Sequence, residues 1–219
     1  MEFNIYGFAV AILVFICSTI YTYLIRKIIL SRYEEKIKNV SPAQEARAIL
    51  KTKDKNIYIG FSFNFFKLEI DKYRNRINVL QKFSSEYTIY SLIHFTFLAY
   101  LYPKKTKLNC FFEYLQKALN VLIFVNILWL STFNLWIIAL SLFGFIFIFN
   151  LIIIIANWKK VNQSLYVSYE KLKYLLTENE YALAVNLLKK YKYYELDKFL
   201  NSGISPFVEM ISSFNQWGK

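Results

Sequence analysis

The chain has 219 residues, of which 56% are hydrophobic, and its 27 Lys and Arg outnumber 15 Asp and Glu for a net charge of +12. Soluble domains average about 45–50% apolar and about 25% charged residues, whereas only 19% of these residues are charged. Residues 3–25 and residues 118–158 contain no charged side chain. This composition excludes a soluble globule, a disordered chain and a secreted disulfide scaffold, and it favours an integral membrane protein.

The first uncharged stretch predicts a membrane anchor over residues 1–25. A helix rises about 1.5 Å per residue and the hydrocarbon core is about 30 Å thick, so about 20 apolar residues cross it. The start of the chain is acidic at Glu2, and no small-x-small cleavage site precedes Arg26. Cleaved signal peptides have a basic start and such a site, so we interpret the segment as a retained anchor.

Residues 26–112 predict a small α+β part outside the membrane. A capping-box pattern of Ser, Pro and Gln starts a helix over residues 41–53. Runs of β-branched and aromatic residues then predict strands at 57–63, 66–70 and 77–80. A polar turn separates the last two strands, so we expect them to pair as a β-hairpin.

An uncharged stretch at residues 87–103 contains the only histidine of the chain, His94. Ser84 and Glu86 suit the first turn of a helix here, and Pro103 suits its end. Lysines flank the stretch on both sides, and a crossing would place one basic cluster outside the cytoplasm. We therefore expect a helix that is buried in protein or lies at the membrane surface rather than a fourth span.

Residues 113–158 predict a transmembrane hairpin. The uncharged part, residues 118–158, is about twice the length of one span, and its turn-like break lies at residues 131–134. Because lipid offers no hydrogen bonds to an open backbone, two helices joined by a tight turn are the expected form. The polar residues that we expect to join the helices are asparagines: Asn120, Asn126, Asn134 and Asn150.

Residues 159–219 predict a helical tail. Thr177 and Glu180 form a second capping box, which opens a helix that Gly203 stops. The apolar stripe of that helix comprises Tyr181, Ala184, Val185, Leu188 and Tyr191. The expected fold class is a predominantly α-helical multi-pass membrane protein with an N-terminal anchor helix, a small α+β part, a transmembrane hairpin and C-terminal helices.

Basic residues flank each predicted span on one side only. Arg26 and Lys27 follow the anchor, Lys117 precedes the hairpin, and Lys159 and Lys160 follow it. The positive-inside rule puts the N-terminus outside and both polar parts in the cytoplasm of a cell, or in the equivalent space at an organellar inner membrane. The basic surface suits anionic lipid, so we expect the bilayer as a partner, with RNA as the lesser alternative.

Five short stretches share a pattern with one family of membrane proteins. They are residues 46–50 (Ala-Arg-Ala-Ile-Leu), 71–80, 84–85, 142–151 and 176–180. In order, they are similar to the first cytoplasmic helix, the β-hairpin, the small polar residues before the zinc motif, the last span and the C-terminal helix of that family. The chain, over about residues 5–200, thus resembles the small multi-pass membrane zinc metallopeptidases of the YugP-like type.

The resemblance implies an H-E-x-x-H zinc site whose ligands this chain lacks. In such helices two histidines four residues apart hold the metal, and the intervening glutamate acts as general base. The matching positions carry His94, Phe95 and Leu98, and the third ligand position carries Asn157 in place of glutamate. Catalytic zinc needs three protein ligands, and the spacing of carboxylates such as Glu113 offers no substitute. We thus expect no catalytic residue, metal or cofactor, and hence a pseudoenzyme.

Three functional hypotheses follow. In the first, residues 26–112 are a degenerate metallopeptidase-like part, and the protein is a non-catalytic structural or scaffold subunit of a membrane complex. Its partners would be other membrane subunits, including an active paralogue or a second copy. In the second, it is an active membrane zinc metallopeptidase with an atypical site. In the third, it is an unrelated structural subunit of an energy-transducing or translocation complex. We favour the first because the framework persists while the zinc ligands are lost.

Overall fold

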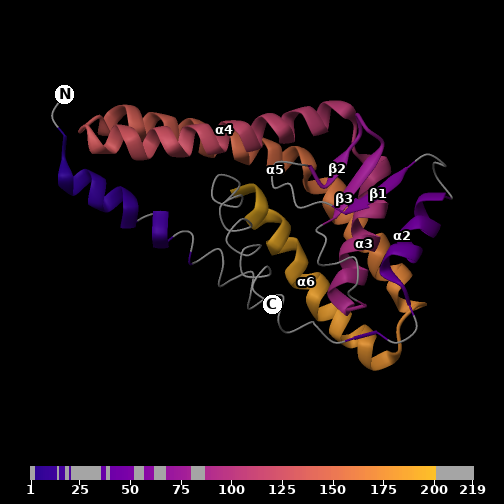
Figure 1. Ribbon diagram of the computed structural model, residues 1–219. Coiled ribbons are helices and arrows are strands. Elements are labelled where there is room, and N and C mark those ends of the chain that lie inside the picture. The colour runs from indigo at the N-terminus through magenta and orange to yellow at the C-terminus, as the bar shows by residue number, and fades with distance from the viewer. Residues whose placement is uncertain are drawn as a thin grey trace.

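In the computed structural model the chain is mostly helical, with one small sheet and a long helical hairpin that extends away from it (Figure 1). The described residues are 3–13, 15–17, 20, 36–37, 40–51, 57–61, 68–79 and 87–200. The predictions for Ser84, Glu86 and Gly203 lie outside these ranges.

Helix α2 (Pro42–Lys51) covers one side of helix α3 (Ile89–Leu101). Proline suits the first helical position because its ring already holds a helical φ angle. The Glu45 amide donates to the Ser41 carbonyl oxygen at 3.0 Å and closes the first turn, so the predicted start is confirmed. The buried residues of α2 are Pro42, Ala46, Ile49 and Leu50.

The sheet contains β1 (Tyr58–Phe61), β2 (Ile70–Asp71) and β3 (Arg76–Val79), in the order β1-β3-β2. β2 and β3 pair antiparallel, with Ile70 opposite Ile77, which confirms the predicted hairpin in a shorter form. β1 pairs with β3 in parallel, a pairing that the local sequence pattern does not predict. Parallel neighbours need a long connection, and here that connection includes β2.

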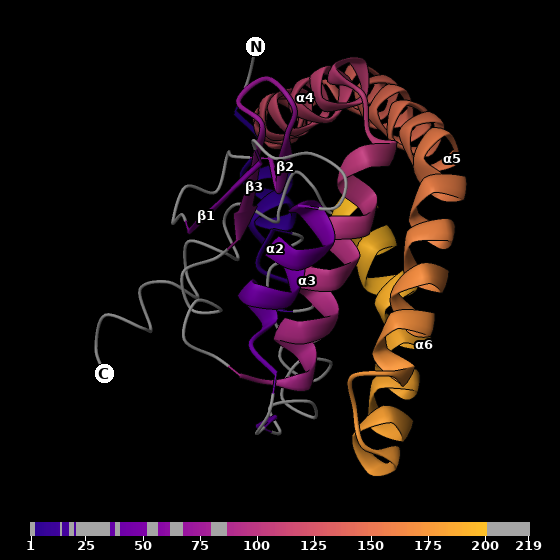
Figure 2. The ribbon, with the colours of Figure 1, turned by 90° about the vertical axis from the view of Figure 1, so that its right-hand side faces the viewer.

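Helix α3 is buried in protein along its whole length, with only Tyr100 partly exposed. Thr88 and Ser91 cap its start reciprocally, because each side-chain oxygen accepts from the other residue's backbone N–H, at 3.2 and 3.1 Å. The first-turn residues predicted upstream are therefore not the cap. Figure 2 shows α3 between α2 and α5 (Trp136–Lys173), and the prediction of a protein-buried helix is confirmed.

Helices α4 (Lys107–Thr132) and α5 form the hairpin. Both are long and apolar enough to cross a membrane, with mean hydropathies of 1.3 and 2.8. The turn lies at residues 133–135, slightly later than predicted, and Asn134 supplies the left-handed backbone there with a φ of 61°. Large apolar side chains cover the outer surface of the hairpin, among them Leu122, Trp129, Ile137, Leu140, Phe143, Ile148 and Ile155.

Helix α5 continues without a break from the hairpin turn to Lys173, so the predicted boundary after residue 158 falls inside it. Figure 2 shows α5 curving from the hairpin towards its packing with α3. Four of its side chains donate to the carbonyl oxygen four residues earlier: Ser141, Asn157, Ser164 and Ser168. Such bonds compete with the helical ladder and favour bending. One helix thus joins the apolar hairpin to the protein core.

Helix α6 (Glu178–Leu200) packs against α3 and α5. Half of its predicted capping box is present, because the Glu180 carboxylate accepts from the Thr177 amide at 3.0 Å; the Thr177 hydroxyl donates to the same carboxylate at 2.8 Å. The buried face of α6 consists of Ala184, Leu187, Leu188 and Tyr191. Of the predicted stripe, Tyr181 and Val185 are half-buried.

The N-terminal helix (Ile5–Cys17) lies against the turn of the hairpin. The Asn4 amide donates to the Thr132 carbonyl oxygen at 2.8 Å, and the Asn4 side chain donates to the Asn134 side-chain oxygen. At Gly7 a Cβ atom would lie 2.4 Å from the Ser131 carbonyl oxygen. The two backbones therefore approach so closely that only glycine fits, as is typical of packed membrane helices.

We expect Gly7→Val to separate the N-terminal helix from the hairpin, because any side chain there collides with the Ser131 backbone. Cysteines replacing Phe3 and Phe133, whose rings lie 6.3 Å apart, report this contact by oxidative cross-linking in a Cys17→Ser background. The matched control is Gly144→Val, since nothing lies within 4 Å of a Cβ atom at that position. Equal cross-linking in both valine variants would contradict the close approach.

Candidate functional site

His94 lies in the middle of α3 and is 4% exposed. Its Nδ1 atom forms a hydrogen bond of 2.5 Å with the Tyr191 hydroxyl on α6. Its Nε2 atom lies 4.0 Å from a carboxylate oxygen of Glu69, the residue before β2. The Tyr90 ring stacks on the imidazole with centroids 5.9 Å apart and an interplanar angle of 8°. Protein groups therefore face both nitrogens and one face of this ring.

The other three positions at which the resemblance implies zinc ligands or a general base carry no metal chemistry. Phe95 and Leu98 are each 1% exposed, and both belong to the hydrophobic core around α3. Asn157 lies on α5, where its Nδ2 atom donates to the Ile153 carbonyl oxygen at 3.1 Å. The fold brings α3 and α5 together, but the side chains at these positions are a phenyl ring, an isobutyl group and an amide bound to its own helix.

The zinc site that the family resemblance implies does not fit these residues. A catalytic zinc ion takes three protein ligands, usually from His, Glu, Asp or Cys. In the described part of the chain no three such side chains lie together in a way that could hold a metal ion. The Tyr191 hydroxyl bonds Nδ1 of His94, and a Glu69 carboxylate oxygen lies 4.0 Å from Nε2. The imidazole of His94, which alone among the four positions could bind zinc, is therefore already engaged by protein groups.

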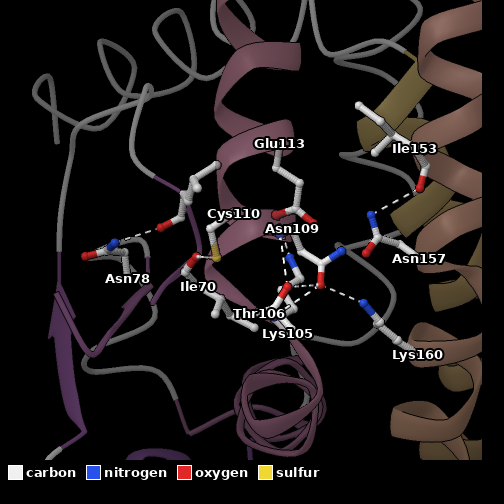
Figure 3. A network of polar contacts seen from close by, with 11 residues as sticks. Ile70, Asn78, Lys105, Thr106, Asn109, Cys110, Glu113, Ile153, Asn157 and Lys160 are labelled. Carbon is white, nitrogen blue, oxygen red and sulfur yellow. Dashed lines mark hydrogen bonds and ion pairs between the residues drawn. The ribbon is translucent and has the colours of Figure 1, made fainter. Parts of the chain in front are cut away.

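A buried ion pair, which the sequence pattern did not reveal, lies at the start of α4. The Lys105 ammonium donates to Glu113 Oε2 at 2.6 Å, and both side chains are 9% exposed (Figure 3). Burial lowers the pKa of Lys105, but the Glu113 and Glu69 carboxylates raise it more, and the net result lies above the ordinary value. The two residues are eight positions apart, on either side of the N-cap Thr106, so helical spacing gives no signal.

The ion pair and the histidine belong to one set of polar groups. We call this set the internal polar network; it consists of Tyr191, His94, Glu69, Lys105 and Glu113. It runs from α6 through α3 and the start of β2 to α4. Glu69 is the central member, because it lies next to the imidazole and also acts on the Lys105 ammonium.

A second group of polar residues joins α4 to α5, and we call it the hairpin seam. Its members are Asn109, Glu113, Gln116 and Asn120 on α4 with Asn150, Asn157 and Lys160 on α5. Gln116 and Asn120 both donate to Asn150 Oδ1, at 2.9 and 3.2 Å. The expected role of Asn120 and Asn150 in joining the helices is thus confirmed, whereas the exposed Asn126 bonds only the Leu122 carbonyl of its own helix.

No protein-family model matches the chain, and neither a curated protein nor a solved structure matches it. The resemblance to YugP-like metallopeptidases therefore stays a prediction from the sequence motifs.

We expect Tyr191→Phe to lower the free energy of unfolding by about 1–3 kcal/mol, because it leaves a buried His94 nitrogen without this hydrogen bond. Urea titration in detergent micelles, followed by tryptophan fluorescence, measures the change. Tyr174→Phe is the control, since that side chain is 81% exposed and should unfold like the wild type. A Tyr191→Phe variant as stable as the control would contradict the role of the hydroxyl.

We expect Glu113→Gln to lower the free energy of unfolding by about 3 kcal/mol, because it leaves the buried Lys105 charge uncompensated. Arg74→Gln is the control, since Arg74 is 73% exposed and lies 4.0 Å from Asp71, and exposed pairs contribute about 0–1 kcal/mol.

The same pair makes stability depend on pH. The pKa of Lys105 is raised in the folded state, so the charged ammonium stabilises the fold. This contribution to the free energy of unfolding is complete below the pKa of the unfolded state, about 10.4, and is lost as pH rises through the pKa of the folded state. The loss of stability above that pH should therefore be smaller in Glu113→Gln than in the wild type. If the free energy of unfolding fell equally in the two proteins as the pH rises, the pair would contribute nothing to stability.

Proposed function

We propose that this chain is a multi-pass membrane protein without catalytic activity, which serves as a structural or scaffold subunit of a membrane complex. The observation that carries the proposal is the environment of His94. The imidazole is bound by Tyr191 and faces Glu69, while the neighbouring positions Phe95 and Leu98 are packed apolar side chains. A site with one engaged imidazole and no general base on its helix has no group to activate water.

The apolar surface of the hairpin supports its place in the bilayer. About 20 residues cross the hydrocarbon core, and α4 with 26 residues and α5 with 38 residues both exceed that length. Their exposed side chains are large and apolar, which suits lipid and not water. The inner face carries the polar residues of the hairpin seam, where they bond one another.

The contact between the N-terminal helix and the hairpin turn supports a third span. Asn4 bonds Thr132 and Asn134, so the N-terminus and the turn lie at the same end of the hairpin. Lysines lie at the opposite end, where Lys107 starts α4 and where Lys159 and Lys160 follow the predicted span on α5. By the positive-inside rule, this distribution favours an N-terminus outside and the α2–α3 part in the cytoplasm.

A scaffold role follows from which features persist. The core around α3 is closely packed, and its polar groups are hydrogen-bonded: Ser91 and Thr96 bond within α3 and its cap, and His94 bonds α6. A chain with this packing and without the zinc ligands retains shape and surface, and these are the properties through which a subunit binds its partners. The partners that we expect are other membrane proteins, including an active relative or a second copy.

Purification of the full chain in mild detergent, with cross-linking and zinc analysis, tests the proposal. We expect the purified chain to form a complex of fixed stoichiometry with one or more membrane proteins. The same complex should form when Gly144→Val replaces the wild type as bait. Its zinc content should be well below one ion per chain. His94→Gln is the matched variant for the metal, because an amide can still bond Tyr191. Near-stoichiometric zinc that His94→Gln abolishes would favour the active metallopeptidase instead, and a monomer without a reproducible partner would contradict the scaffold.

A further inference from the structure

The hairpin seam contains three buried acceptor atoms that accept no hydrogen bond from the described residues, and two of them, on Glu113 and Asn157, lie between the same pair of interhelical bonds. On α4 its residues are spaced four, three and four apart, so they share one face of the helix. At one end the Lys160 ammonium donates to Asn109 Oδ1 at 2.6 Å, and at the other Gln116 donates to Asn150. These two bonds set the register, and Glu113 and Asn157 lie between them.

Glu113 and Asn157 are 7% and 4% exposed, and each has one oxygen that accepts no hydrogen bond from the described residues. The atoms are Glu113 Oε1 and Asn157 Oδ1. Figure 3 shows both side chains between the two helices, beside the Lys160–Asn109 bond. Buried acceptors without a donor are costly and rare in native proteins, so a donor is expected at this place.

The two side chains cannot supply the donor themselves. The Lys105 ammonium donates to Glu113 Oε2, and a carboxylate in an ion pair has no proton to donate to Asn157. Rotating the Asn157 amide would turn its NH₂ group towards Glu113. It would also break the bond from Nδ2 to the Ile153 carbonyl oxygen and place Asn157 Oδ1 against that oxygen, and both of these atoms are acceptors.

Charge decides the nature of the occupant. Lys105 and Lys160 carry two positive charges near the single negative charge of Glu113, so a further cation would be repelled. An anion needs donors, whereas both open atoms are acceptors. The occupant must be neutral, small enough for a closed helix interface, and able to donate two hydrogen bonds. Water has these properties, and buried waters typically bind otherwise unpaired polar groups.

We propose that the hairpin seam contains a water-binding site in which one water molecule donates to Glu113 Oε1 and to Asn157 Oδ1. The bound water extends the internal polar network from Glu113 on α4 to Asn157 on α5. The Lys105–Glu113 ion pair at the start of α4 is then joined through this water to Asn157 on α5. The site does not depend on whether the chain is a scaffold.

X-ray radiolytic labelling of the full chain in detergent, in oxygen-18-labelled water, tests the site. Radicals formed from bound water oxidise side chains that bulk solvent does not reach, and Ile153, 5% exposed, lies one turn from Asn157 on the same buried face. We expect Ile153 to be oxidised several-fold faster than Leu172, an equally aliphatic side chain of α5 that is 0% exposed. Oxidation of Ile153 at the rate of Leu172 would overturn the proposal.

A pair of variants separates bound water from general solvent entry. Asn157→Leu removes one of the two acceptors, and Asn126→Leu is its match, because each asparagine donates to a carbonyl oxygen four residues earlier but Asn126 is exposed. We expect several-fold slower oxidation of Ile153 in Asn157→Leu and the wild-type rate in Asn126→Leu. Rapid oxidation that persists in Asn157→Leu would also overturn the site. The comparison of Ile153 with Leu172 in the wild type stands even where a variant fails to fold.

Discussion

Burial of α3 is the constraint on which the other elements depend. The helix is apolar on nearly all sides, so it is stable only where α2, α5 and α6 remove it from solvent. Its polar side chains must then find partners inside the protein. Thr96 donates to the Leu92 carbonyl oxygen at 2.7 Å, Ser91 bonds the cap, and His94 bonds Tyr191. The hydroxyl of Tyr191 thus allows an imidazole to be buried without the cost of an unpaired polar group.

The Lys105–Glu113 ion pair lies where the chain passes from this core into the apolar hairpin. A buried ion pair often contributes little net stability, because removing two charges from water offsets their attraction. Its geometry is nevertheless specific: the Lys105 ammonium can meet Glu113 only when the chain after α3 enters α4 in one orientation. The ion pair therefore specifies the angle between the core and the hairpin more than it increases the free energy of unfolding. The curvature of α5, which carries its own side-chain-to-backbone bonds, accommodates that angle on the other side.

Local patterns in the sequence account for many of the elements, and contacts between distant residues account for what the patterns miss. The start of α2, the β2–β3 hairpin, the apolar helix α3 and the contact between Thr177 and Glu180 all depend on residues a few positions apart, and all were predictable. The parallel pairing of β1 with β3 depends on a connection whose path the sequence does not specify. The His94–Tyr191 bond joins residues 97 positions apart, and no periodicity reports such a contact.

The candidate site shows the same limit in its chemistry. The sequence predicts that Phe95, Leu98 and Asn157 bring no zinc ligand beside His94, because residue type alone decides what an atom can coordinate. It could not identify Tyr191 and Glu69 as the groups that face the imidazole, nor Lys105 as the partner of Glu113. Those assignments require the fold, since each joins groups from different elements.

The packing around His94 also bears on whether a metal site could form there. Phe95 and Leu98 are each 1% exposed, so a glutamate at the first position would place a charge in an apolar core. An isolated buried carboxylate is strongly disfavoured unless a metal or a cation compensates it. A histidine at the second position would add a polar ring without a partner. Either substitution alone would destabilise α3. Only both substitutions together, with a metal ion bound, would offset this cost. A core filled by phenylalanine and leucine at these positions is therefore separated from zinc chemistry by an energetic barrier.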